Sequence, residues 1–485
     1  MLFSTLAHRV LSTPIRSAAA QSRPADRDDQ SFGRRVWANV QSSFGFPAAA
    51  GGLSLAMCLF AGCHREPPPL EFEPNLVHAM KYQMKEGIPM EQAGEDAFWV
   101  VTKMFGTPEN PKLPTIVTED EEFASLLSQE NLVRASGRIG QEGRGLYQTH
   151  CVTCHGTTGN GRGELSSTMS PYPRDYRKGV FKYKSTSRGA KPTREDLTGL
   201  IKNGIDGTRM VAIPNISDEE VQSLVDYVIY LSWRGELERQ LIDDAVYELD
   251  LEAGDRIIDP AAQDGTGEAK EIYDESWELA EDFALDIGEG WLEAPDEVVE
   301  IPDPPEDFVV PNSHEEFVAA MQDDRAETLA ASVERGGNLF RGKIASCSKC
   351  HGEQGRGDGQ NTDYDDWTKE WTLGIGIKPE NREELIKLLA RGALPPINAT
   401  PRNFELGAFH GGSTAKDLYM RIIEGIEGTP MPAVTFVPDE FEEDDVWHLI
   451  NFIRSLQKAP EGQEADENVS EDEVSEGQAP EKQTA

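Results

Sequence analysis

Cysteine, long apolar runs and clustered positive charge are all scarce in this sequence. Six cysteines among 485 residues are too few for a disulfide-stapled scaffold. After residue 63, no stretch approaches the roughly 20 apolar residues that a membrane-spanning helix needs. Lysine and arginine number 46 against 86 aspartate and glutamate residues, whereas nucleic-acid binding depends on clustered basic residues. Disulfide-rich modules and nucleic-acid-binding proteins are therefore excluded.

The net charge of -40 is concentrated in two stretches. Residues 236–330 hold 31 acidic against 4 basic residues, and residues 459–485 hold 9 against 1. These stretches carry 35 of the 40 net negative charges, so the rest of the chain is nearly balanced. At roughly 100 to 200 residues per domain, the length allows two to four domains.

Four of the six cysteines occur in two copies of one motif. Residues 151–155 read C-V-T-C-H and residues 347–351 read C-S-K-C-H, so both are C-x-x-C-H. At the cysteine and histidine frequencies of this chain, one chance match is expected in about 0.1 % of such sequences. Two copies therefore indicate a repeated chemical site.

The other two cysteines lie in a leader with the anatomy of an export signal. An apolar run over residues 44–62 follows two arginines. Residues 59–63 read L-F-A-G-C and resemble a bacterial lipobox, which would make Cys63 the lipidated first residue of the mature protein. An uncleaved membrane anchor and plain soluble export are the alternatives. Cys58, Cys63 and His64 also form a C-x4-C-H spacing, but a hydrophobic leader offers no folded pocket for a haem.

An internal repeat divides the rest of the chain. Each copy has a leucine and an aromatic residue before its motif and four equally spaced glycines after it. A Pro-Arg-x-aromatic segment, a Gly-x-x-Gly-Thr-x-Met segment and an amphipathic helix then follow in both copies. The sequence thus predicts a leader (1–63), a helical extension with Pro-rich links (64–136), a first module (137–235), an acidic insertion (236–332), a second module (333–458) and a disordered acidic tail (459–485).

Helix signals occur outside the motifs as well. Residues 75–104 have the apolar spacing of a helix, and Ser217 with Glu220 predicts a capping box ahead of the closing helix of the first module. Ser313 with Glu316 predicts another helix start in the insertion. The insertion also contains aromatic residues, so we expect it to be partly ordered and packed on the modules. The tail has none and should be disordered.

The geometry of C-x-x-C-H favours covalent haem. Two thiols on one helical turn can add to the two vinyl groups of one porphyrin, and the adjacent histidine meets the iron from the same side. Cys151, Cys154, Cys347 and Cys350 are therefore the predicted attachment residues. Zinc held by four thiolates and a thioredoxin-like disulfide are the alternatives, but neither explains the histidines, glycines and methionines of the repeat.

A second axial ligand must come from elsewhere in each module. Met210 and Met431 are predicted, because each ends the repeated Gly-Thr-x-Met segment, and a soft thioether favours ferrous iron. Methionine as flexible core filler is the alternative for a lone residue. The rival ligands are His150, Met169, His410 and His448.

Two arginines occupy matching places in the repeat. Arg174 and Arg402 follow a proline in each copy. Guanidinium binds carboxylates bidentately, so both are candidate partners of haem propionates. A plain surface arginine is an equally good interpretation of either residue.

Each module resembles a class I bacterial cytochrome c domain through its C-x-x-C-H motif and its methionine segment. The resemblance covers residues 137–235 and 333–458. It implies an all-α fold in which the first and last helices of each module cross and enclose haem. By similarity, His155 and His351 are the proximal ligands and the two methionines are the distal ones. The first module lacks the usual Met-Pro pair, and the second has extra residues before its methionine.

The resemblance implies a dihaem c-type cytochrome that carries single electrons and catalyses no bond-making reaction. Its layout is similar to the dihaem subunit of cbb-type haem-copper oxidases and to cytochrome subunits of alternative quinol-oxidising complexes. We expect a subunit or shuttle between a quinol-oxidising complex and a terminal oxidase, anchored on the periplasmic side of a bacterial membrane. Redox proteins are the expected partners, with no small-molecule substrate and no nucleic acid. The alternatives are a dihaem peroxidase and a docking subunit that depends on its acidic insertion.

Overall fold

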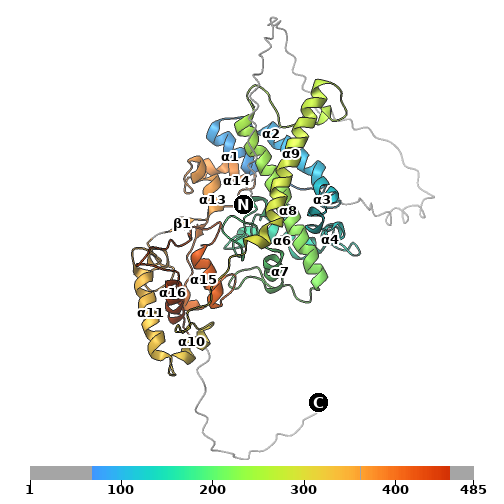
Figure 1. The fold of residues 1–485 in the computed structure, drawn as a ribbon. Helices are drawn as coiled ribbons and strands as arrows, with labels where there is room; N and C mark the ends of the chain where they lie inside the picture. The colour runs from blue at the N-terminus through green and yellow to red at the C-terminus, as the bar shows by residue number, and fades with distance from the viewer. Residues whose placement is uncertain (1–67, 361, 459–485) are drawn as a thin grey trace, which may run out of the picture. The chain divides into compact units, whose positions relative to one another are not determined.

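A computed structural model describes residues 68–360 and 362–458. The predicted leader, with Cys63, and the predicted tail lie outside the described residues. The described part is built from helices, and its one sheet pairs two residues of β1 (Asp363–Tyr364) with two of β2 (Asn398–Ala399) in antiparallel register (Figure 1). The predicted all-α fold is confirmed. Within the described ranges, no helix is both long and apolar enough to span a membrane.

The N-terminal extension forms five helical segments. Gly87, with φ of 76°, ends the first of them and breaks the predicted helix 75–104 into two. The buried faces of the second and of the last pack against the closing helix of the first module. The segments are α1 (Leu76–Glu86), α2 (Glu91–Phe105), α3 (Thr115–Glu119), the 3-10 turn η1 (Phe123–Ser125) and α4 (Gln129–Ala135).

The first module is organised around one long helix, α8 (Asp218–Glu248). Its predicted capping box is present: the Ser217 hydroxyl accepts from the Glu220 amide, and the Glu220 carboxylate accepts from the Ser217 amide. The other elements are α5 (Leu146–His150), α6 (Val152–His155), η2 (Ser166–Thr168), η3 (Tyr176–Lys178) and α7 (Arg194–Asn203).

The first module differs from the prediction in the length of its last helix and in the shortness of its first. Its last helix does not stop at residue 235, because Leu237, Leu241 and Ala245 continue the buried face of α8 into the acidic segment. Its first helix is only five residues long, because the chain before it bends at glycines with positive φ. The extension helix α4 packs on α8, and α5 contacts α8 as well, with the ring centroids of Tyr147 and Tyr227 4.9 Å apart. The glycines are Gly137, Gly140, Gly143 and Gly145.

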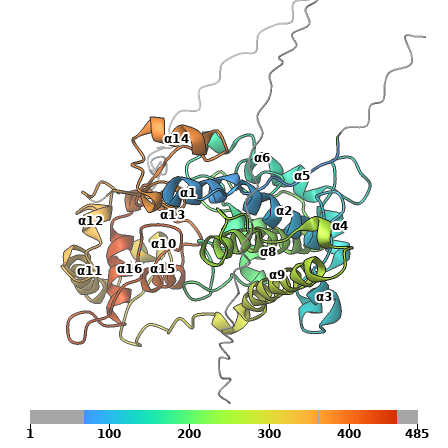
Figure 2. The ribbon, with the colours of Figure 1, turned by 90° about the horizontal axis from the view of Figure 1, so that it is seen from above.

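The acidic insertion contains a helix of 25 residues, α9 (Glu268–Leu292), that lies beside α8 (Figures 1 and 2). The Trp233 indole donates to the carbonyl oxygen of Ala284 at 2.8 Å. A Cβ on Gly288 would lie 2.6 Å from the rings of Phe123 and Trp233, so glycine permits this close approach. The insertion also contains η4 (Pro260–Ala262), η5 (Ala294–Glu297) and α10 (His314–Ala320), whose predicted N-cap, Ser313, accepts from the amide of Glu316.

In the second module the first and last helices cross, α11 (Ala326–Arg341) over α16 (Asp445–Ser455) (Figure 2). The crossing depends on Gly336, because a Cβ there would overlap the carbonyl oxygen of His448. Helix α11 begins inside the predicted insertion, so that its first seven residues, 326–332, precede the expected boundary. The remaining elements are α12 (Ser348–His351), α13 (Asp366–Trp371), η6 (Leu373–Ile375), α14 (Arg382–Leu389), η7 (Phe404–Leu406) and α15 (Ala415–Ile423).

The extra residues of the second module pack on the N-terminal extension. Trp371 is 2 % exposed and lies in one apolar cluster with Val77 and Met80 of α1. This tryptophan is one of the extra residues of the second module, and the chain buries it against the extension. Nearby, the Glu370 carboxylate is the centre of an ion network that joins α1, η3, α8 and α13. Its cationic neighbours are Lys81 at 3.0 Å, Lys178 at 2.8 Å and Arg239 at 2.6 Å, and the ring of His78 lies 3.4 Å away.

Two candidate haem sites

The thiols and histidine of each motif lie on one short helix. Cys151 precedes α6, which contains Cys154 and His155, and the second motif is arranged in the same way on α12. All four thiols are free and partly buried. Two thiols on one turn with an adjacent imidazole is the donor set that covalent haem attachment requires.

Each histidine ring is oriented by a backbone carbonyl. The Nδ1 atom of His155 donates to the carbonyl oxygen of Arg174 at 3.2 Å, and Nδ1 of His351 donates to that of Arg402 at 3.3 Å. Burial lowers the pKa of His155 to about 4 and also lowers the pKa of His351. Both rings are therefore neutral at pH 7, and Nε2 is left as the basic nitrogen, which is the state that an iron ligand needs.

An aromatic ring lies flat against each histidine. Tyr176 stacks on His155 with ring centroids 4.7 Å apart, and Phe404 stacks on His351 at 4.6 Å. Both aromatic residues belong to the repeated Pro-Arg-x-aromatic segment, whose match was visible in the sequence although its packing role was not. The backbone of this segment is tied to the motif, because the amide of Tyr176 donates to Gly159 at 2.8 Å and that of Phe404 donates to Gly355 at 2.7 Å.

The glycines after each motif make a tight turn that returns to the helix carrying the thiols. The amide of Gly163 donates to the carbonyl oxygen of Cys154 at 3.0 Å, and that of Gly359 donates to Cys350 at 3.1 Å. A Cβ at either glycine would overlap the carbonyl oxygens of the motif helix. A side chain is therefore excluded at these two positions of the turn.

The two methionine loops also have the same local structure. The amide of Met210 donates to the hydroxyl of Thr208 at 3.0 Å, and the amide of Met431 donates to that of Thr429 at 3.2 Å. Each threonine hydroxyl in turn donates to the carbonyl oxygen three residues before it. Both methionines are half-buried. The same hydrogen bonds thus hold the backbone of both loops, and the two methionines stay the predicted distal ligands.

The rival ligands lie in other surroundings. His150 is exposed, Met169 is half-buried after η2, and His448 contacts Ser332 at 2.7 Å and the ring of Phe308. His410, the strongest rival in the sequence, contacts Arg402 and the hydroxyl of Tyr183 instead; the Tyr183 oxygen is 3.1 Å from His410 Nδ1.

Neither a shared zinc site nor an activated thiolate is favoured by the surroundings of Cys151 and Cys347. Among residues 68–360 and 362–458, no group of three or more His, Cys, Asp or Glu side chains could hold a metal ion, so the two Cys pairs do not share a zinc site. Burial raises the pKa of Cys151 to about 12 and that of Cys347 to about 11. Zinc-binding and redox-active thiols have the opposite shift. Each site as a whole fits haem c better than either alternative.

Arg174 and Arg402 both lie beside the candidate sites. Each supplies the carbonyl oxygen that binds its own histidine. Within the described ranges neither guanidinium has a carboxylate oxygen within 4.0 Å. Their positive charges are therefore available to an anionic group such as a haem propionate.

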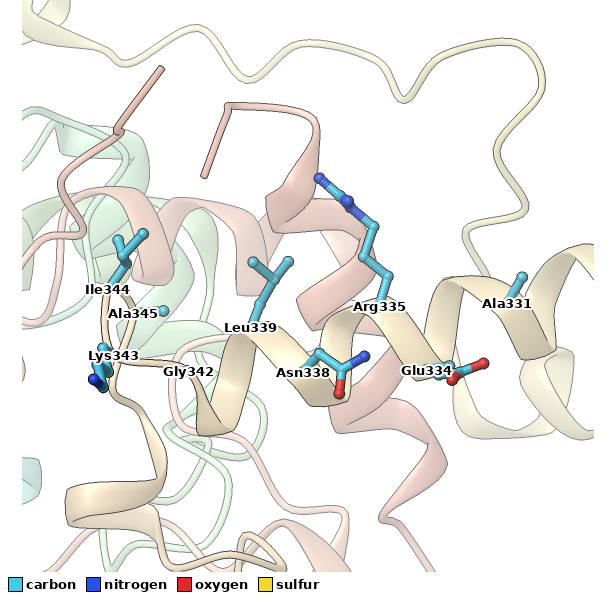
Figure 3. A pocket seen from close by; sticks show the side chains of 9 residues that line it. All are labelled: Ala331, Glu334, Arg335, Asn338, Leu339, Gly342, Lys343, Ile344 and Ala345. Atoms are coloured by element: carbon cyan, nitrogen blue, oxygen red, sulfur yellow. The ribbon is translucent and has the colours of Figure 1, made fainter. Parts of the chain in front are cut away.

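A surface depression of about 460 Å³ lies beside the second site. Figure 3 shows Ala331, Arg335 and Leu339 along one side of α11, and Ile344 on the loop that leads to Cys347. Ile344 is 38 % exposed. Accessible apolar and cationic side chains therefore lie within a few residues of the first thiol of this motif.

The N-terminal extension holds the turn that follows the first motif. The Glu73 amide donates to the Thr158 hydroxyl at 2.8 Å, and its carboxylate accepts from Asn160 at 3.0 Å and Arg162 at 2.8 Å. Two neighbouring residues of the extension contact α8. The Asn75 amide donates to the buried carboxylate of Glu238, and the Arg234 guanidinium lies over the ring of Phe72. The sequence offers no signal for these long-range contacts.

Comparison with known proteins agrees with the duplicated geometry. Residues 139–228 match the family model described as cytochrome C oxidase, cbb3-type, subunit III, and residues 333–457 match the model described as cytochrome c. No curated protein matches the chain. A chain of the Kuenenia stuttgartiensis reducing HAO-like protein complex Kustc0457/Kustc0458 is 21 % identical, with 68 % of this chain and 97 % of that chain covered and a TM-score of 0.36. The chain therefore contains two cytochrome c domains, one in each module, and has the layout of a dihaem cytochrome c.

Proposed function

We propose that this protein is a dihaem c-type cytochrome that carries single electrons in a respiratory chain outside the cytoplasmic membrane. The observation that carries the proposal is the duplicated site: thiol pair, carbonyl-bound histidine, stacked aromatic ring and methionine loop recur in both modules. Haem c, when bound, supplies a reversible one-electron iron couple. Electron transfer is the common function of cytochrome c domains, so two domains support two such couples in one chain.

The residues of the chain then have distinct tasks. The cysteine pairs would hold each haem covalently, and the carbonyl oxygens of Arg174 and Arg402 keep the two histidine rings in one tautomer and orientation. Met210 and Met431 would supply the opposite axial ligand, which raises the reduction potential over that of a bis-histidine site. The stacked aromatic rings exclude water from the histidine side.

We place the protein between a quinol-oxidising complex and a terminal oxidase, as a subunit or a shuttle. The match of the first module to a cbb3-type oxidase subunit supports this placement. The export signal and lipobox-like end of residues 1–63 support a periplasmic protein anchored through Cys63 or through the apolar leader. Membrane fractionation, with the intact mass of the mature N-terminus, tests the anchor. A soluble periplasmic protein without lipid would contradict it.

A basic redox protein is the partner that we propose. Helix α9 has nine acidic residues and one lysine, and opposite charge on a partner would speed encounter. Second-order rate constants of electron transfer should then fall as salt is added. Rates that do not change with ionic strength would contradict a charge-steered encounter.

We propose an electron carrier rather than a peroxidase. A peroxidase needs one iron with an open or displaceable distal position, whereas both modules here have equivalent methionine loops. The experiment is a stopped-flow measurement of the fully reduced protein. Rapid reoxidation by a one-electron acceptor with slow reaction toward peroxide supports the carrier. Peroxide-dependent oxidation at enzyme-like rates would overturn it.

A further inference from the structure

Arg174 and Arg402 each connect the two modules. The carbonyl oxygen of each binds the histidine of its own motif, while its guanidinium lies against the methionine loop of the other module. A Cβ on Gly428 would lie 3.0 and 3.3 Å from the Nη atoms of Arg174. A Cβ on Gly207 would lie 3.6 Å from Nη1 of Arg402. The contacts are therefore reciprocal, and each arginine spans from one candidate iron site toward the other.

The two methionine loops meet at a shared surface that we call the seam, formed by residues 180–189 and 204–210 of the first module and 410–412 and 424–431 of the second. Lys184 pairs with Glu427 at 2.8 Å, and the amide of Arg188 donates to Glu424 at 2.9 Å. The Tyr183 hydroxyl reaches His410. A cavity of about 490 Å³ lies along the seam with residues of both modules around it.

Lys182, Arg174 and Arg402 bring positive charge to the seam, beside His410, which is neutral at pH 7. Lys182 and His410 occupy equivalent positions, each directly after an aromatic residue, Phe181 and Phe409, that stacks in its module. Burial and then the charge of Arg174 lower the pKa of Lys182 to about 8, and burial and then Arg402 lower the pKa of His410 to about 4.

Acidic side chains offset this charge only in part. The pKa of Arg174 is lowered by its burial, and the charges of Asp365 and Glu427 oppose that shift. Glu427 is already paired with Lys184, and no carboxylate oxygen within the described ranges lies within 4.0 Å of either arginine. Two guanidinium groups in such a place need an anionic partner.

We propose that Arg174 and Arg402 couple the two redox sites, each of them setting the midpoint potential of the opposite module's site as well as that of its own. The proposal rests on the proposed function, because it requires a haem in each module. Reduction adds one negative charge to an iron site, so a nearby cation stabilises the reduced form. Because each guanidinium is half-buried and close to both modules, its charge acts on both sites. Loss of either charge therefore lowers both potentials.

The experiment is a potentiometric titration of the full-length holoprotein with Arg174→Gln or Arg402→Gln. Each variant is expected to lower both midpoint potentials, with the ratio of reduced to oxidised haem at a fixed ambient potential falling about threefold to tenfold, or about 28 to 59 mV. Arg174→Lys keeps the charge and is expected to restore most of both shifts. A purely structural role would not give this rescue.

Two matched variants separate charge from other effects. Arg325→Gln removes an exposed positive charge away from the seam, and Tyr183→Phe removes the contact with His410 without a change of charge. Both are expected to leave the two potentials within experimental error.

Two outcomes would overturn the coupling: each arginine variant shifts one potential only, or Arg325→Gln gives the same shifts as Arg174→Gln. Haem content, measured first by pyridine haemochrome, keeps this result apart from the proposed function. A haem-free protein would refute the proposed function itself. A protein with two haems, in which each arginine variant shifts only one midpoint potential, would refute only the coupling.

Discussion

His155 donates from Nδ1 to the carbonyl oxygen of Arg174 at 3.2 Å, and this contact is reproduced in the second module by His351 and Arg402 at 3.3 Å. The partners are 19 residues apart in the first module and 51 in the second. The same ring orientation is thus reached through loops of very different length. A contact preserved across that difference indicates that the orientation of the imidazole is functional rather than a consequence of local packing.

Replacement of both cysteines of one motif is expected to remove one haem and leave the other. Cys347→Ser with Cys350→Ser should give a protein with half of the haem, since serine cannot form the thioether bonds. The mirror variant, Cys151→Ser with Cys154→Ser, is the matched control and should retain the second haem. Intact mass and pyridine haemochrome measure the content. Two haems in either double variant would contradict the assignment.

Loss of a distal thioether should lower one reduction potential. In Met210→Leu or Met431→Leu the ferrous form loses its soft ligand, so one of the two midpoint potentials falls and half of the methionine-to-iron charge-transfer absorbance of the oxidised protein disappears. Potentiometry followed by visible absorption gives both readouts. Met169→Leu, at a rival position, is expected to change neither. An unchanged charge-transfer band in Met431→Leu would point to another ligand in the second module.

The crossing of α11 and α16 should tolerate no side chain at its centre. Gly336→Ala is expected to lower the free energy of unfolding by about 3 kcal/mol, because the new Cβ meets the carbonyl oxygen of His448 and the helices must separate. Gly199→Ala, in the helix α7, is the control, since nothing lies within 4 Å of its Cβ position. It should raise the stability by about 0.5 to 1 kcal/mol. Urea unfolding measures both, and equal effects would contradict the packing argument.

The ion network around Glu370 should make stability depend on pH. Burial raises the pKa of this carboxyl, but the charges of Arg239, Lys178 and Lys81 and the hydrogen bond from His78 outweigh burial and hold the pKa well below its ordinary value. A carboxyl with a depressed pKa stabilises the fold fully above its unfolded pKa of about 4.3, and this contribution is lost as the pH falls toward the folded value.

Glu370→Gln is accordingly expected to cost about 3 kcal/mol at pH 7, because three cations lose their shared partner. The difference from the unaltered protein should shrink when unfolding is measured below pH 4. Glu278→Gln, on the exposed side of α9, is the control and should change the stability by less than about 0.5 kcal/mol. A penalty from Glu370→Gln that is independent of pH would show that the charge is not what matters.

The local features of the fold were predictable from the sequence, and the long-range ones were not. The capping box at Ser217 and the helix start at Ser313 depend on residues three positions apart, so their spacing is enough to find them. Helix α8 runs past the predicted boundary at residue 235, because its buried apolar positions continue among the acidic residues of the predicted insertion. The burial of Trp371 against α1 involves residues almost 300 positions apart, for which one sequence has no signal.

In the candidate sites, too, the local motifs were predictable from the sequence and the contacts between modules were not. The repeat identified the thiols, the histidines and the methionine loops, because each belongs to a short motif present twice. The assignment of Met210 and Met431 as iron ligands, and of Cys63 as a lipid anchor, remains a prediction. The reach of Arg174 to Gly428 was not foreseen, since the repeat shows which residues correspond but not how two modules face each other.

The central claim is that each motif carries one covalently attached haem. Electrospray mass measurement of the purified mature protein under denaturing conditions tests it most directly, because only covalently bound groups survive. We expect a mass above that of the polypeptide and any lipid by two haem groups, and the loss of one of these groups in each double cysteine variant. A mass that equals the polypeptide, with or without lipid, would contradict it.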